Sequence, residues 1–154
     1  MNKRVLVPLE TTKAVEQLWP VLTMMAAAGA SVRLIHVAPM PQNVVTPQGR
    51  TVAYAEQEMA KVETLWSDRL RDIGARLPNG AEQVVRFGEA ADEILREAET
   101  FGADTILVST GTRSSVKRAL LCSVAEAMLR RARPGVLLYR SPRAAGPSRR
   151  SAGR

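Results

Sequence analysis

The residues best suited to hold a ligand follow three short apolar runs of the chain. Grouped by run, they are Pro8, Leu9 and Glu10, then Val37, then Ser109, Gly111, Thr112 and Arg113. Hydroxyl groups can donate hydrogen bonds to a phosphate, and the Arg113 guanidinium supplies positive charge. If the runs are parallel strands, their carboxyl ends meet at one edge of a sheet, where ligands of open sheets bind. The sequence therefore predicts one cleft at that edge, with weak anion binding.

Side chains that could do catalysis are scarce. His36 is the only histidine and ends an apolar run, so we expect it to be packed in the core, and no serine or cysteine has another imidazole partner. Cys122 is expected to be a small buried residue; the alternative is a thiol whose pKa is lowered by a helix N-terminus. Glu89, Asp92 and Glu93 lie where a helix should begin, and acids there interact with the helix dipole. We predict no catalytic residue and no metal site, and slow ATP hydrolysis ranks last.

Five short apolar or β-branched runs alternate with longer segments of helical periodicity. The predicted strands are residues 4–9, 32–37, 83–87, 105–109 and 136–139. The run Val5-Leu6-Val7 is apolar on both faces, as expected when helices cover both sides of a sheet. This alternation is typical of βα units around a parallel sheet. The predicted fold class is α/β, a three-layer open sheet of five parallel strands, and the order 3-2-1-4-5 makes the first and fourth strands neighbours.

The helical segments carry apolar residues at three- and four-residue steps, which predicts one buried face on each helix. Pro78-Asn79-Gly80 is expected to stop the second helix and Gly102 the third. The fourth helix is expected to begin near Ser123 and to bury Val124, Ala125, Met128 and Leu129. The connector at residues 40–50 is longer than most loops of such folds, and it is either a lid or partner surface or a mobile exposed loop.

The length of 154 residues suits one domain, and we assign residues 1–140 to it. The net charge is +7, but residues 140–154 contain five arginines and no acid, so the rest of the chain carries 7 − 5 = +2. Residues 141–154 are expected to form a disordered Arg-rich tail. No apolar run approaches the roughly 20 residues of a membrane span, and the N-terminus does not read as a signal peptide. We expect a cytoplasmic protein that makes no membrane contact.

Five segments together resemble the universal stress protein family, in the correct order over residues 3–140. They are Val5-Leu6-Val7-Pro8-Leu9-Glu10, Leu34-Ile35-His36-Val37, Gly88-Glu89-Ala90-Ala91-Asp92-Glu93-Ile94, Ala103-Asp104-Thr105-Ile106-Leu107-Val108, and residues 114–130 followed by Pro134-Gly135-Val136-Leu137-Leu138. The resemblance implies a Rossmann-like fold of the adenine nucleotide alpha hydrolase type. It also implies a stress-response or regulatory domain without catalysis.

Nucleotide-binding members of that family have a G-x-x-G-x9-G-[ST] loop, whose glycines let backbone amides approach the phosphates. Here the three glycine positions fall on Ser109, Thr112 and Cys122, while the final hydroxyl is kept as Ser123. An acid after the first strand, usually aspartate in the family, is Glu10. A side chain at each glycine position narrows the loop, and positive φ at Thr112 would cost about 1 kcal/mol or more. The loop therefore predicts no tight ATP binding.

The alternative is a universal stress protein that binds ATP or another adenine nucleotide. Leu9, Glu10 and Val37 would then line the base and ribose, and the phosphates would be held by Ser109, Thr112, Arg113 and Ser123. The wider set of candidate contacts adds Pro8, Gly111, Cys122 and Val124. ATP is the one candidate cofactor. A further alternative is an adaptor whose basic tail binds anions or nucleic acid by nonspecific electrostatics.

The last predicted strand is expected to lie at an edge of the sheet, with backbone groups left to pair. A second copy can satisfy them by antiparallel pairing across a twofold axis, and the family resemblance suggests the same dimer. The candidate interface of a homodimer is therefore Val136, Leu137, Leu138 and Tyr139. A regulatory protein partner is also expected, with no residues to assign to it.

Overall fold

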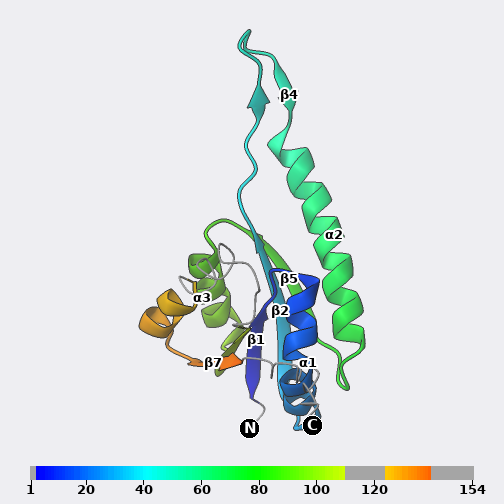
Figure 1. Ribbon diagram of the computed structural model, residues 1–154, viewed down its shortest axis with the longest axis vertical. Helices are drawn as coiled ribbons and strands as arrows, with labels where there is room; N and C mark the ends of the chain where they lie inside the picture. Colours follow the sequence, from blue (N-terminus) through cyan, green and yellow to red (C-terminus); the bar gives the residue numbers. More distant parts are fainter. Residues whose placement is uncertain (1–2, 110–123, 140–154) are drawn as a thin grey trace, which may run out of the picture.

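The computed structural model describes residues 3–109 and 124–139. Its centre is a sheet of five parallel strands in the order β5-β2-β1-β6-β7 (Figure 1). The strands are β1 (Arg4–Pro8), β2 (Ser31–Ala38), β5 (Glu82–Phe87), β6 (Thr105–Ser109) and β7 (Gly135–Tyr139). The predicted α/β class, the five strands and their order are confirmed. The first strand ends one residue earlier than predicted, and three of the others begin one residue earlier.

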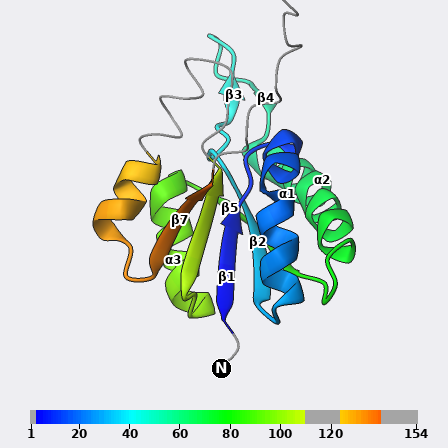
Figure 2. The same cartoon turned by 60° about the horizontal axis from the view of Figure 1, so that its bottom comes forward.

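Helices cover both faces of the sheet, which gives three layers. α1 (Thr12–Ala27) and α2 (Ala55–Ala75) lie on one side, and α3 (Ala90–Phe101) lies on the other with the helix at residues 124–131 (Figure 2). In β1, Val5 and Val7 pack in the core cluster that includes α1 and α2, whereas Leu6 packs in the cluster that includes α3. Successive residues of a strand point to opposite faces, so a strand that is apolar at every position needs a cover on each side.

The helix ends follow local signals in the sequence. The Thr11 side-chain oxygen accepts a hydrogen bond from the amide of Ala14 at 3.3 Å and caps α1. Gly102 ends α3 in the left-handed conformation, with φ of +66°, and α2 ends ahead of Pro78-Asn79-Gly80. Among the described helices, none is both long and apolar enough to cross a membrane.

One prediction about the last helix is wrong. Ala125 and Met128 are buried as expected, but the Leu129 side chain is 57% exposed. Adjacent helical residues lie about 100° apart around the axis, so Leu129 lies off the face that packs Met128 against the sheet.

The connector at residues 40–50 belongs to a β-hairpin, which the sequence does not predict. β3 (Val44–Val45) pairs antiparallel with β4 (Thr51–Ala53), and Figure 1 shows this hairpin extending away from the sheet beside the start of α2. The amide of Thr46 donates to the carbonyl of Arg50 at 2.8 Å, and Gly49 has φ of +79°, a value that favours glycine. Strands this short carry no periodic pattern, which is why the sequence shows only a loop.

Candidate functional site

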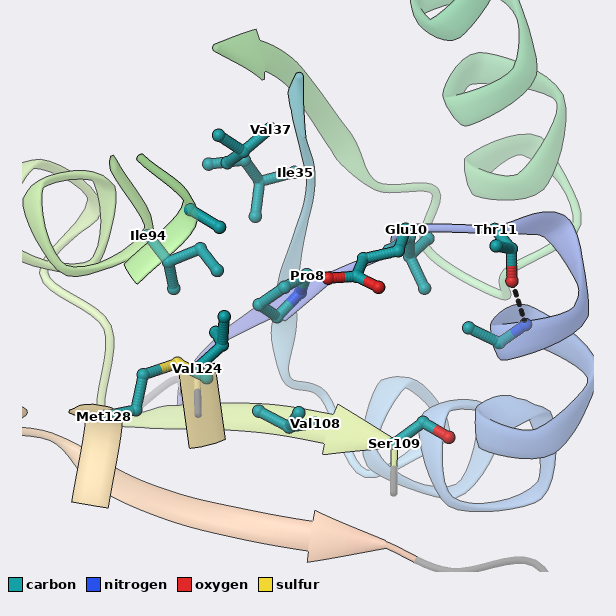
Figure 3. A pocket seen from close by; sticks show the side chains of 13 residues that line it. Pro8, Glu10, Thr11, Ile35, Val37, Ile94, Val108, Ser109, Val124 and Met128 are labelled. Atoms are coloured by element: carbon teal, nitrogen blue, oxygen red, sulfur yellow. Dashed lines mark hydrogen bonds between the residues drawn. The ribbon is translucent and has the colours of Figure 1, made fainter. Parts of the chain in front are cut away.

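A pocket of about 270 Å³ opens at the carboxyl ends of β1, β2 and β6, at the sheet edge where the sequence predicts a cleft (Figure 3). β1 lies between β2 and β6, so the chain exits of these strands converge. Its described lining residues are Pro8, Leu9, Glu10, Thr11, Ala14, Ile35, Val37, Ala90, Ile94, Val108, Ser109, Val124 and Met128.

Six of the residues predicted to contact a ligand lie together in this pocket. They are Pro8, Leu9, Glu10, Val37, Ser109 and Val124. The other candidates, Gly111, Thr112, Arg113, Cys122 and Ser123, lie outside the described residues, as does the tail at residues 141–154.

Most of the pocket wall is apolar, and several of its residues are not among those that the sequence predicts for the site. Ile94 of α3 and Met128 of the last helix face it across from Ile35 of β2 (Figure 3). Both helical residues fit the apolar spacing of a buried helix face, and that spacing does not separate a core position from a pocket wall. Ala90 and Ile94 fall in the segment 88–94 that resembles the family, which was the one available signal.

The exit of β1 is held by β2 through both backbone groups of Leu9. The Leu9 amide donates to the carbonyl of Ile35 at 2.8 Å, and Nδ1 of His36 lies 2.8 Å from the Leu9 carbonyl oxygen. Glu10 follows with its side chain exposed, and Figure 3 shows its carboxylate turned toward Pro8 at the pocket. The structure thus places an acid at the mouth of an apolar cavity.

Ser109, at the end of β6, is buried and already bonded within the protein. Its hydroxyl donates to Oε1 of Gln17 in α1 at 2.7 Å. A hydroxyl has one proton to donate. In this arrangement the Ser109 hydroxyl proton forms a hydrogen bond between β6 and α1 and is not donated to a ligand in the pocket.

His36 is packed in the interior, as predicted. Its side chain is buried, and its ring stacks on Trp66 of α2 with a centroid distance of 3.5 Å and an interplanar angle of 8°. Burial lowers the pKa of His36, the hydrogen bond to Leu9 opposes this, and the charge of Arg69 lowers the pKa further. His36 is not among the residues that line the pocket.

The fold and the position of the pocket define a class of protein. A parallel sheet with this strand order, covered on both faces and open to a ligand where the order reverses, is a Rossmann-like α/β domain. A family model, the universal stress protein family, matches residues 1–140. The chain belongs to the universal stress protein family.

Solved structures of similar fold agree with this family. The hypothetical protein MJ0577 matches with a TM-score of 0.73 and 19% identity, over 94% of this chain and 99% of that one. A universal stress family protein from Burkholderia pseudomallei matches with a TM-score of 0.63 and 26% identity, over 88% and 94%. A search of curated proteins found no match.

Several of the similar structures contain nucleotides. A universal stress protein in complex with cAMP matches with a TM-score of 0.56 and 19% identity, over 92% of this chain and 98% of that one. Family proteins from Archaeoglobus fulgidus and Arabidopsis thaliana, with TM-scores of 0.55 and 0.53, are in complex with dAMP and with AMP respectively.

Proposed function

We propose that this chain is a non-catalytic regulatory domain whose pocket binds an adenine nucleotide weakly, mainly through the base and ribose. The observation that carries the proposal is the pocket itself, an apolar cavity with the Glu10 carboxylate at its mouth. Ligand pockets are commonly apolar with a few polar groups that fix orientation. The AMP, cAMP and dAMP complexes of the similar structures support the choice of ligand.

The apolar residues suit a purine, and the acid suits a ribose. Ile35, Val37 and Ile94 provide apolar surface for a flat base, which the hydrophobic effect favours. The Glu10 carboxylate can accept hydrogen bonds from ribose hydroxyls. A contribution from the phosphates is expected to be small, because the three positions that the family resemblance matches to loop glycines carry side chains here, and Ser109 donates to Gln17.

The absence of catalysis is proposed from the position of the only imidazole. His36 is bonded to Leu9 and stacked on Trp66, and it does not line the pocket. It therefore has no access to a bound ligand as a general base. Incubation of the protein with ATP and Mg²⁺ should release no phosphate above the level of buffer. Phosphate release that persists through repeated purification and stops when a ligand occupies the pocket would contradict this prediction.

Removal of the Glu10 carboxylate tests the binding role of the pocket. Glu10→Ala should weaken AMP binding tenfold or more, because a hydrogen bond to a charged group contributes about 1.5–3 kcal/mol. Isothermal titration of AMP into dialysed protein measures the effect, with Glu16→Ala as the matched control, since Glu16 is an exposed acid of α1 that does not line the pocket. Equal affinity of the two variants would contradict the role of Glu10.

We also propose that the protein forms a homodimer through β7. One side of β7 pairs with β6, and its other side pairs with no strand among the described residues. Leu137 and Leu138, which point to opposite faces of the sheet, are 41% and 40% exposed, so a second copy paired along β7 has apolar surface to cover on each face.

A further inference from the structure

The carbonyl of Leu9 receives a hydrogen bond from a side chain at the point where β1 leaves the sheet. β1 aligns with β6 only through Val5 and Leu6, and it continues beside β2 to Pro8, which has no amide proton. The next residue, Leu9, is 1% exposed and lines the pocket. Its amide is satisfied by Ile35 and its carbonyl by His36, each at 2.8 Å. The backbone that leads into Glu10 is therefore fixed on β2.

The imidazole that makes this bond is itself held in one orientation. A carbonyl oxygen only accepts hydrogen bonds, so Nδ1 of His36 is the protonated nitrogen. Trp66 of α2 stacks almost parallel on the imidazole ring of His36, which restricts rotation of the ring. The Arg69 guanidinium lies over the Trp66 ring, 5.2 Å from its centroid, in a cation–π contact.

Trp66, His36 and Leu9 thus form a continuous contact from α2 through β2 to the wall of the pocket. We propose that His36 is a positioning residue: by donating to the Leu9 carbonyl, it fixes the backbone that presents Glu10 to the ligand. The part of this inference that concerns ligand affinity rests on the proposed function. The part that concerns the β1 exit is independent of any ligand.

Two substitutions separate the hydrogen bond from the bulk of the side chain. His36→Leu keeps apolar volume and removes the donor, whereas His36→Asn keeps an N–H donor near the position of Nδ1. Ile73→Val is the control for general destabilisation, because Ile73 is buried on α2 and lies outside the pocket lining. If His36 positions the exit of β1, the Asn variant should match the wild type in amide exchange and in AMP affinity, and the Leu variant should not.

The first measurement needs no ligand. Exchange of the Leu9 amide, which is bonded to Ile35, should be about tenfold or more faster in His36→Leu when followed by NMR, because local opening no longer breaks a bond to His36. In His36→Asn and Ile73→Val the same amide should exchange within about threefold of the wild-type rate relative to the rest of the sheet. Equal protection of the Leu9 amide in the Leu variant and the wild type would overturn the inference.

The second measurement is titration with AMP. His36→Leu should weaken binding about tenfold, while His36→Asn and Ile73→Val should stay within about threefold of wild type. Loss of affinity in the Asn or Ile73 variant equal to that in the Leu variant would assign the effect to stability and overturn the positioning role. If the wild type binds no AMP, the proposed function fails, and amide exchange alone decides whether His36 fixes the β1 exit.

Discussion

At the scale of single residues, His36 connects α2 to the wall of the pocket through its contacts with Trp66 and Leu9. It is the only histidine of the chain, and burial lowers its pKa from the ordinary value of 6.5. The folded state therefore prefers the neutral imidazole, which is also the form expected beside the charge of Arg69.

This preference predicts a dependence of stability on pH. As the pH falls below 6.5, the unfolded chain takes up a proton at His36 while the folded protein does not, so the free energy of unfolding decreases. Urea unfolding at pH 7.5 and 5.5 should show a larger loss for the wild type than for His36→Asn, which has nothing to titrate at this position. Equal losses in the two proteins would contradict the lowered pKa.

At the scale of elements, α3 is fastened to the sheet by a buried carboxylate. The Glu97 side chain is 4% exposed and accepts from Nη1 of Arg33 in β2 at 2.6 Å and from Nη2 of Arg86 in β5 at 3.0 Å. Burial acts to lower the pKa of Arg33, but its hydrogen bonds and the charges of Glu82 and Glu97 outweigh burial and raise it. α3 also carries Ile94, which lines the pocket, so these ion pairs hold in place the helix that forms one wall of the pocket.

Removal of the Glu97 charge should weaken the whole domain. Glu97→Ala is expected to cost about 1.5–3 kcal/mol of unfolding free energy, because Arg86 loses its carboxylate partner whereas Arg33 keeps Glu82. Urea denaturation followed by circular dichroism measures this cost. Glu99→Ala, an exposed acid on the same helix, should change stability by less than about 0.5 kcal/mol. Similar losses for both variants would show that the network does not stabilise α3.

The sequence predicted these elements better than it predicted the site. The five strands of the sheet were found because runs such as Val5-Leu6-Val7 are apolar on both faces and short enough to exclude a helix. The hairpin of β3 and β4 was missed because two or three residues carry no periodicity. The topology predicts the pocket residues that lie at strand exits. It does not predict Ile94 and Met128, because these two residues meet only through the packing of two separate helices.

At the scale of the whole molecule, a twofold dimer is predicted by two features: the edge of β7 that pairs with no described strand, and the exposed side chains of Leu137 and Leu138. Light scattering on the eluted protein should give twice the 16.8 kDa mass of one chain. Replacing both Leu137 and Leu138 by Lys should yield the monomer, because two like charges would then face each other across the pairing edge. Leu65→Lys, at an exposed leucine of α2, should remain dimeric. A wild-type monomer at high micromolar concentration would contradict the interface.

If the pocket holds an adenine nucleotide by its base and ribose, as we propose, the phosphates should contribute little to affinity. The most direct measurement is isothermal titration of AMP, ADP and ATP, with and without Mg²⁺, into the same dialysed protein. We expect dissociation constants of about 0.1–1 mM that agree within about threefold across the three nucleotides, because each phosphate should add less than about 0.7 kcal/mol of binding free energy. ATP bound tenfold or more tightly than AMP, or no heat from any of the three up to millimolar concentration, would contradict it.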